Sequence, residues 1–445
     1  MAIAKENLKY HLLIFFFSPV IGLIYSLRNG SLKTIRWSIF AFTVIYGSLF
    51  TFSILGSELG SKRGEGSDGA VHWNKVYSHY QYLEFSEWWK ELLAIMQLDP
   101  AFGSYTDPYA HILAYFIGGV LNAPQLFFVG VATVFGYFYS GAIVRIIKYI
   151  NWSSGYNKFY FTFMVILFTL WCLPSSMQTV RTWTGMWVLV YAVLSYHDTK
   201  KWKYLILALC PLFIHFGYTV LGIGVWLVLF SSYRNPKLYF IIFIISLFVS
   251  NFVAKSGFNE YATQTELGKS KVKGYYADDE RQAEKDQKIS KTSRKANFYK
   301  SYEIQGIHHY VLSGMIIFIF IFLRQNGFGK TENMLFSYGL AQASVANFFT
   351  SIFAVYNRGW VIAGVFIIAL MLVFLSKQKL INIRLATLKV KLPLFLIVVF
   401  IFPYMLFFLS VFLNMTSVFA IFLPIVSWIN PEVGISIRDT IVLFL

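Results

Sequence analysis

The chain has 445 residues, of which 57% are hydrophobic, 20% are aromatic and only 13% are charged. Apolar runs of roughly 20 residues recur nearly from end to end, and each is long enough to cross a hydrocarbon core about 30 Å thick. This composition excludes an ordinary water-soluble protein, and continuously apolar runs such as residues 240–249 exclude the alternating strands of a membrane β-barrel.

The net charge of +17 is concentrated in short connections between the apolar runs. By the positive-inside rule, these connections are expected to be cytoplasmic. The charge is therefore interpreted as a topology signal, and no nucleic-acid partner is expected. The basic residues of these connections are Arg28, Lys33, Arg36, Arg145, Lys148, Lys200, Lys201, Lys203, Arg234, Lys237, Lys377, Lys379, Arg384, Lys389 and Lys391.

With the basic connections inside, the first half of the chain divides into spans and one large external segment. Residues 57–107 form that segment, and residues 108–121 are too short to cross, so they are expected to form a re-entrant or interfacial helix. Residues 202–230 are too long for one helix and too short for two full spans, so two short helices are expected to meet near His215 and Gly217. The spans expected in this half are residues 10–27, 36–56, 125–147, 158–173 and 178–196.

The second half contains the most polar stretch of the chain, residues 255–308, with interleaved charges of both signs. It is either a solvated loop or a lid over an external cavity, and the sequence leaves both open. Residues 416–445 are expected to form a last span and an interfacial tail. The other spans expected here are residues 238–254, 310–323, 334–354, 359–375 and 392–413.

These elements predict an all-α polytopic membrane protein with about 11–14 transmembrane or re-entrant helices. Residues 1–445 are expected to form a single integral membrane domain, with residues 57–107 and 255–308 as its two large external loops.

Two apolar spans carry ionisable residues, Arg181 and His215, without which they would be more stable. A charge at membrane depth costs about 2.5 to 3.5 kcal/mol, so it suggests a functional site. Arg181 is expected one turn inside the external end of its helix, His215 at the same level, and Arg358 at the external end of another span. Arg181 could also snorkel to the interface, and His215 could be a hydrogen-bonded core residue.

The anion-binding interpretation of Arg181 rests on its guanidinium group, which keeps its charge and donates two parallel hydrogen bonds to phosphate. Gln178 precedes Arg181 by three residues, so on a helix both would face one cavity. The three basic groups at one depth indicate a site for a lipid that carries a diphosphate.

The first external segment combines acids, imidazoles and aromatic rings, including Asp68, His72, Trp73 and Tyr77. Aromatic faces with polar groups bind sugars well, but they are also typical of the membrane interface. No metal-ligand spacing, Walker loop, dinucleotide motif or nucleophile elbow is present, so no metal or cofactor is expected.

The order of these features resembles the EpsG-like branch of the Wzy-type polysaccharide repeat-unit polymerases, which act on O-antigen or exopolysaccharide. The resemblance covers roughly residues 38–375. It departs from the family at Gly69 and His72, where tyrosines are common, and at Phe216 and Gly217, where a Ser or Thr often follows the histidine. The motifs that carry it are Gly66-Ser-Asp68, Asp107-Pro-Tyr-Ala-His-Ile-Leu113, Gln125-Leu-Phe-Phe128, Gln178-Thr-Val-Arg181, Phe213-Ile-His215-Phe-Gly-Tyr218 and Tyr356-Asn-Arg358.

The resemblance implies a fold similar to the GT-C glycosyltransferases and polymerisation at the external face of a bacterial inner membrane. The substrate would be an undecaprenyl-diphosphate-linked oligosaccharide, with a flippase and a chain-length regulator as further partners. Arg181 and Arg358, with Gln178, would bind the diphosphate, and His215 or Asp68 would act as the general base. His72, Trp73 and Tyr77 would contact the glycan. The alternatives are another lipid-linked glycosyltransferase or ligase, and a flippase for lipid-linked sugars.

Overall fold

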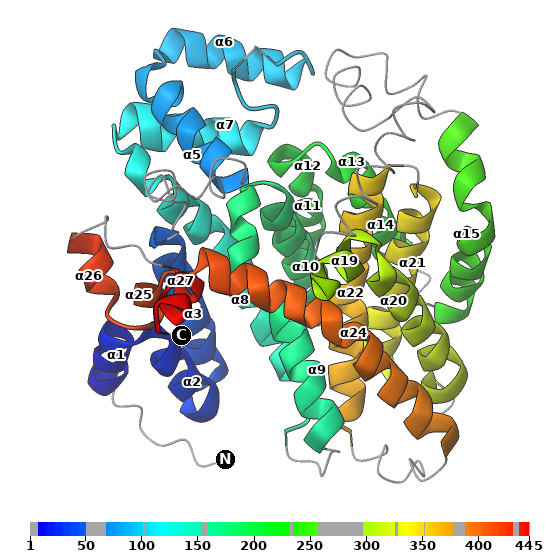
Figure 1. Ribbon diagram of the computed structural model, residues 1–445. Helices are drawn as coiled ribbons and strands as arrows, with labels where there is room; N and C mark the ends of the chain where they lie inside the picture. Colours follow the sequence, from blue (N-terminus) through cyan, green and yellow to red (C-terminus); the bar gives the residue numbers. More distant parts are fainter. Residues whose placement is uncertain are drawn as a thin grey trace. The chain divides into compact units, whose positions relative to one another are not determined.

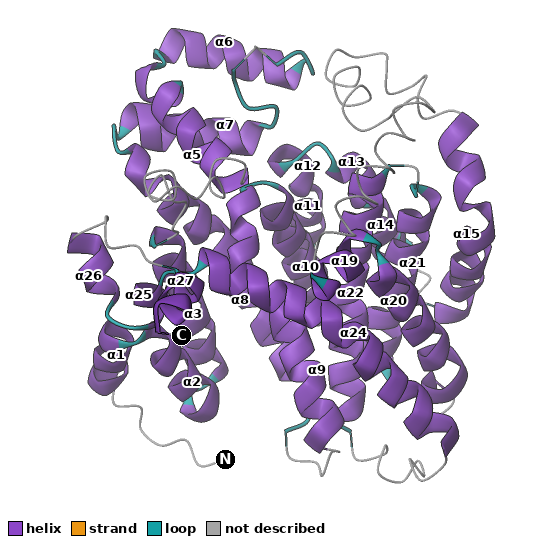
Figure 2. Ribbon diagram, in the orientation of Figure 1, coloured by secondary structure: helices purple, strands orange, loops and turns teal. Residues whose placement is uncertain are grey.

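The protein is described here from a computed structural model. In the described residues the regular structure is helical (Figure 2), and they contain no strand beyond an isolated bridge between Ser417 and Ser436. The predicted all-α class is confirmed for this part of the chain. The described residues are 8–49, 68–100, 103–152, 158–171, 173–231, 235–256, 297–324, 328–350, 352–377, 388–429 and 436–444.

Four helical segments of the described chain are long and apolar enough to cross a membrane: Pro124–Tyr149, Phe159–Thr179, Ala354–Leu375 and Leu392–Met415. Three apolar helices are shorter: Lys203–Ile214, Pro236–Val249 and Ile307–Leu323. These segments support a membrane protein, whereas the count of 11–14 transmembrane or re-entrant helices stays a prediction.

Proline explains why one expected span is broken. Residues 10–27 form two helices, α1 (Leu8–Phe17) and α2 (Pro19–Asn29), instead of one. Pro19 has no N–H group to continue α1, and the Ser18 hydroxyl accepts a hydrogen bond from the Ile21 N–H at 3.2 Å. A serine N-cap followed by proline is a strong helix start, so the chain begins a new helix inside the apolar run.

The chain forms two compact units. Unit 1 comprises Met1–Lys148, Pro174–Phe216 and Ser410–Leu445, and unit 2 comprises Tyr149–Leu173 and Gly217–Leu409. Besides α1 and α2, the elements of unit 1 are α3 (Leu32–Ser48), α5 (Asp68–Ser78), η1 (Tyr80–Tyr82), α6 (Phe85–Met96), α7 (Pro108–Ala114), η2 (Tyr115–Val120), η3 (Pro124–Leu126), α8 (Phe127–Tyr149), η4 (Pro174–Thr179), α10 (Thr182–Thr199), α11 (Lys203–Leu209), α12 (Pro211–Ile214), α25 (Val418–Ile421), α26 (Pro424–Ile429) and α27 (Ile437–Phe444).

The core of unit 1 is built around α10, whose side chains from Thr184 to Ser195 are buried. Trp187 packs edge-on against Tyr139 of α8 with ring centroids 4.8 Å apart, and it is fully enclosed. Between residues 68 and 114, the helices α5, α6 and α7 pack into a small helical group (Figure 1). This group places the polar side chains of α5 and α6 on defined helices.

Unit 2 is held together by buried polar bonds between helices. Trp360 of α22 donates to Asn347 of α21 at 3.2 Å, and Asn347 donates to Ser246 of α15 at 3.0 Å. Such interhelical bonds and small residues at helix contacts are typical of membrane bundles. The elements of unit 2 are α9 (Lys158–Trp171), α13 (Tyr218–Leu221), α14 (Ile223–Phe230), α15 (Pro236–Ser256), α19 (Phe298–Ile304), α20 (Ile307–Phe318), η5 (Ile319–Leu323), α21 (Lys330–Phe348), α22 (Phe353–Leu375) and most of α24 (Leu388–Met415).

Residues 108–121 form a short helical segment, α7 followed by the π-helical η2, whereas their re-entrant or interfacial placement stays a prediction. Residues 202–230 break near His215 as expected, but they form the four short helices α11 to α14 instead of two. Most of the second external segment, residues 257–296, lies outside the described residues. The single-domain interpretation and the lid or loop alternative stay predictions.

Gly224 brings α14 and α21 into backbone contact. A Cβ at this position would lie 2.6 Å from the Cα of Gln342 and 2.7 Å from the carbonyl oxygen of Ala341. We expect Gly224→Ala to lower the free energy of unfolding by about 1–3 kcal/mol, because two helix backbones must separate. Thermal unfolding of the purified protein in detergent measures this.

Gly314→Ala is the matched control, since a Cβ at Gly314 meets nothing within 4 Å. It is expected to leave the stability unchanged or to raise it by up to about 1 kcal/mol through helix propensity. Equal losses in the two variants would contradict the close approach of α14 and α21.

Candidate functional site

Asp107 is the centre of a buried polar cluster in unit 1. It is 1% exposed and precedes Pro108, the first residue of α7. A residue before proline favours an extended backbone, and Asp107 has φ −130° and ψ 134°. Its side chain does not cap its own helix, so the carboxylate is available to other elements.

Both carboxylate oxygens of Asp107 have partners from other parts of unit 1. Oδ1 accepts a hydrogen bond from the Phe216 backbone N–H at 2.7 Å and lies 3.2 Å from Nδ1 of His215. Oδ2 accepts from the guanidinium of Arg181 and from the Thr106 hydroxyl at 3.1 Å. Asp107 thus links Arg181 and His215, which are 34 residues apart in the chain.

The electrostatics of the cluster favour an ionised carboxylate. Burial raises the pKa of Asp107, but the hydrogen bond and charge of His215, the charge of Arg181 and the Phe216 N–H together outweigh it. The pKa of Asp107 is therefore held well below its usual value of 3.8. At neutral pH the carboxylate is a charged acceptor for both basic side chains.

Arg181 is placed differently from the sequence expectation. The helix expected over residues 178–196 begins only at Thr182, and Arg181 is the N-cap of α10. Val180 has φ +58°, a left-handed backbone that a β-branched residue rarely adopts, and it separates α10 from the 3-10 helix η4. This turn directs Arg181 toward Asp107, and 22% of its side chain remains exposed.

The expectation that Gln178 and Arg181 lie one turn apart on one helix is therefore wrong. Gln178 belongs to η4, and the chain turns at Val180 before Arg181. The Oε1 atom of Gln178 is buried without a hydrogen-bond partner in the described structure. Gln178 therefore carries an unsatisfied acceptor, but it does not share a helix face with Arg181.

His215 lies at the break between α12 and α13, as expected. It follows α12 with an extended backbone, φ −157° and ψ 116°, and 12% of its side chain is exposed. A neutral histidine that donates from Nδ1 to a carboxylate carries its basic lone pair on Nε2. The Asp107 contact therefore orients the ring, and it defines which nitrogen can accept a proton.

His72 lies beside this cluster and is 8% exposed. Its Nδ1 is 3.1 Å from the hydroxyl of Tyr105, on which the ring also stacks. Burial, followed by the nearby charges of Arg181 and Lys75, lowers the pKa of His72 to about 3. His72 is therefore a neutral hydrogen-bonding group at physiological pH.

A chain of hydrogen bonds fixes the segment that leads into Asp107. The Tyr105 N–H donates to the Tyr80 hydroxyl at 2.9 Å, and Tyr80 is bonded to Nδ1 of His111 at 2.8 Å. Nε2 of His111 donates to the Trp88 carbonyl at 3.1 Å. These bonds connect η1, α6 and α7, so this helical group positions the carboxylate.

Three other predicted site residues, Asp68, Trp73 and Tyr77, belong to α5, and none of them forms a hydrogen bond with Asp107 in the described part of the chain. Asp68 is exposed at the first residue of α5 and makes no ion pair within the described residues. Trp73 packs on Tyr77 with centroids 5.1 Å apart and stacks on Phe128 of α8 at 6.2 Å. Both Trp73 and Tyr77 are half-buried and form part of the packing of α5.

Arg358 belongs to α22 of unit 2. The Asp107 cluster lies wholly in unit 1, so a common site of Arg358 and Arg181 stays a prediction. In the described part of the chain, no group of three or more His, Cys, Asp or Glu side chains could hold a metal ion.

Neither Asp107 nor the Tyr80–Tyr105–His111 network is among the site residues predicted from the sequence. A signal for Asp107 was present, because an acid directly before a proline and an apolar helix must find a partner when buried. Its partners come from residues 181 and 215, and no local spacing identifies them.

No family model, curated protein or solved structure matches this chain.

We predict a pH-dependent stability from His72. The unfolded chain binds a proton near pH 6.5 and the folded chain only near pH 3, so the free energy of unfolding falls as the pH drops through this window. Between pH 7 and pH 5 the loss is about 2 kcal/mol. Asp107 acts in the same direction, but only below its usual pKa of 3.8. Chemical denaturation at the two pH values measures the loss.

His72→Gln should reduce the difference in unfolding free energy between pH 7 and pH 5 by about 2 kcal/mol. His79→Gln is the matched control, because it removes a partly exposed histidine from the same helical group. An unchanged difference in His72→Gln would refute a buried neutral imidazole.

Asp107→Asn is expected to lower the free energy of unfolding by about 1.5–3 kcal/mol, the typical contribution of a hydrogen bond to a charged group. The substitution keeps the volume but removes the charge that Arg181 and His215 contact. Asp198→Asn is the control, because Asp198 pairs near the surface with Lys148 at 3.5 Å and with Arg145 at 4.0 Å, and pairs at the surface contribute about 0–1 kcal/mol each. Thermal unfolding of both variants in the same detergent compares them.

Proposed function

We propose that this protein is a glycosyltransferase that polymerises undecaprenyl-diphosphate-linked oligosaccharide repeat units of a bacterial surface polysaccharide. It would act at the external face of the inner membrane with a GT-C-like architecture. The observation that carries the proposal is that one buried carboxylate, Asp107, binds both Arg181 and His215. These are the two residues whose presence in apolar spans suggested a site.

His215 is the proposed general base. The carboxylate of Asp107 accepts a hydrogen bond from Nδ1 of His215, so Nε2 of His215 is the nitrogen that removes the proton from the attacking sugar hydroxyl. The hydroxyl oxygen then forms a bond to the anomeric carbon, and the bond from that carbon to the diphosphate oxygen breaks. The electron pair leaves with the diphosphate, and the proton remains on His215. A positioned base of this kind contributes about 10²–10⁴ in rate.

Arg181 is the proposed partner of the leaving group. A guanidinium has five N–H donors, and the contacts with Asp107 and Thr106 both use NH1. The exposed part of the side chain supports contact with a diphosphate. A donor aimed at charge that develops in the transition state is worth about 10²–10³ in rate.

The remaining residues have supporting roles in this proposal. The diphosphate-binding roles of Arg358 and Gln178 stay predictions from the sequence: Arg358 belongs to unit 2, and the Oε1 atom of Gln178 is a buried acceptor without a hydrogen-bond partner in the described residues. His72, Trp73 and Tyr77 of α5 keep their expected role as contacts for the glycan. Asp68 is the weaker candidate for the base, because it is exposed and is not part of the Asp107 cluster.

The test is to mix the purified protein with its undecaprenyl-diphosphate-linked repeat unit and to analyse the products by gel and mass spectrometry. The wild type should form a ladder. Arg181→Ala should lower the rate by about 10²–10³, and His215→Gln should lower it by about 10²–10⁴. Arg145→Ala and His79→Gln are the controls in unit 1, and they should retain the ladder.

Two other results would replace the proposal. Movement of labelled lipid-linked oligosaccharide between vesicle leaflets, without any new glycosidic bond, would indicate a flippase. Transfer of the glycan to a different acceptor would indicate a ligase or another lipid-linked glycosyltransferase.

A further inference from the structure

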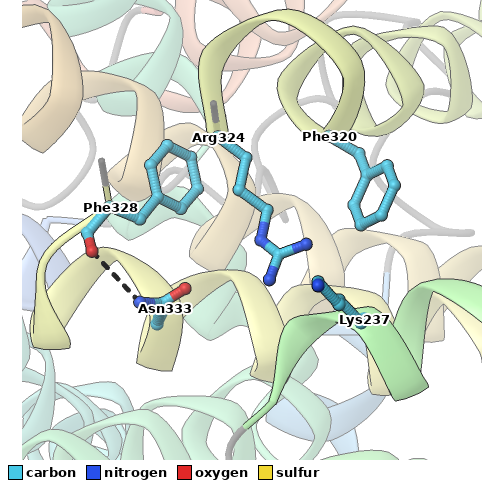
Figure 3. Close-up of a pocket in the computed structure, with 5 residues that line it drawn as sticks. All are labelled: Lys237, Phe320, Arg324, Phe328 and Asn333. Atoms are coloured by element: carbon cyan, nitrogen blue, oxygen red, sulfur yellow. Dashed lines mark hydrogen bonds between the residues drawn. The ribbon is translucent and has the colours of Figure 1, made fainter. Parts of the chain in front are cut away.

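A cavity of about 450 Å³ in unit 2 is lined by two cations, two aromatic rings and an amide. Lys237 comes from the first turn of α15 and Phe320 from η5, and Arg324 directly follows η5. Phe328 precedes α21, and Asn333 lies in its first turn. Figure 3 shows the guanidinium of Arg324 directed into the space between Asn333 and Lys237. The positive side chains of Lys237 and Arg324 thus line the same cavity.

The lining described for this cavity contains no carboxylate. The adjacent acid on α21, Glu332, is 1% exposed and forms an ion pair with Lys377. Lys237 and Arg324 therefore face each other without an acidic lining partner. Two like charges repel at short range, and an anion between them would remove this repulsion.

Aromatic packing holds the guanidinium in place. The Arg324 Cζ lies 5.2 Å from the ring centroid of Phe320, and Phe320 stacks on Phe240 of α15 with centroids 3.6 Å apart. A guanidinium stacked on an aromatic ring keeps its in-plane N–H donors for an acceptor. This donor geometry suits the oxygens of a phosphate group.

The opposite wall is also fixed. The Asn333 side-chain amide donates to the Phe328 carbonyl at 3.2 Å, and the Asn235 side chain accepts from the Lys237 N–H at 3.0 Å. The second bond caps the start of α15, so Lys237 lies at a helix N-terminus, where the helix dipole also favours an anion.

An exposed apolar surface begins next to the charged end of the cavity. On α15, Leu238, Ile241 and Ile245 are between 42% and 56% exposed, and their spacing places them along one helix face. The sequence predicts that the connection containing Lys237 is cytoplasmic, and basic pockets between helices on that side bind lipid headgroups. A phosphate bound here would have a surface for acyl chains beside it.

We propose that this cavity binds a phosphate group between Arg324 and Lys237, with an anionic phospholipid as the molecule that carries it. The acyl chains lie along the apolar face of α15. This site belongs to unit 2 and is independent of the glycosyl-transfer proposal, which rests on unit 1.

The test uses the full-length protein in detergent and measures bound lipid by native mass spectrometry. The probes are phosphatidylglycerol, phosphatidylcholine and soluble glycerol 3-phosphate. The wild type should retain phosphatidylglycerol in preference to phosphatidylcholine. Arg324→Gln and Lys237→Gln should each weaken that binding about tenfold, equivalent to about 1.4 kcal/mol.

Lys203→Gln is the control, because it removes an exposed lysine from another connection predicted to be cytoplasmic. It should leave lipid binding unchanged. If glycerol 3-phosphate binds with the same dependence on Arg324 and Lys237, the phosphate site is supported and its natural ligand is soluble. Equal binding of phosphatidylglycerol to the wild type and to both variants would overturn the proposal.

Thermal unfolding in phosphatidylcholine separates lost binding from lost folding. If Arg324→Gln unfolds because Phe320 loses its partner, Lys237→Gln still decides the outcome, since Lys237 is an exposed residue of the first helical turn. Unchanged phosphatidylglycerol binding in a folded Lys237→Gln protein would then refute the site.

Discussion

The buried carboxylate of Asp107 is the constraint on which the geometry of the site depends. Removing an ion from water costs several kcal/mol even after relaxation, so a charged Asp107 requires donors on both oxygens. Arg181, His215, the Phe216 N–H and the Thr106 hydroxyl supply them. The same bonds that satisfy the carboxylate also orient the two side chains proposed to act on substrate.

Local irregularity in the backbone is what brings these donors together. Arg181 follows a left-handed Val180, His215 lies in an extended break after α12, and Asp107 is extended before a proline. A regular α-helix across any of these positions would direct the side chain along its own helix surface. Strained or broken backbone is common at functional sites because the surrounding contacts hold it there.

The positive side chains of the two proposed sites have different partners. In unit 1 the site arginine is paired with a buried acid, whereas in unit 2 Lys237 and Arg324 line a cavity whose described lining has no acid. A paired cation orients groups and changes the pKa of its neighbours. Two cations that line a cavity without an acid attract an external anion. For this reason we assign a catalytic role to Arg181 in unit 1 and an anion-binding role to Lys237 and Arg324 in unit 2.

The sequence by itself determined the helical class and the membrane character, and it singled out Arg181 and His215 as site candidates, because long apolar runs and rare internal charges are local signals. It also predicted the break at His215 and the short helical segment after Asp107. Only the tertiary structure decided that Asp107 is the shared partner, that Gln178 and Arg181 do not share a helix face, and that His72 is buried beside the cluster. These facts depend on a turn at Val180 and on contacts between residues up to 109 positions apart, and no periodicity along the chain records contacts at that range.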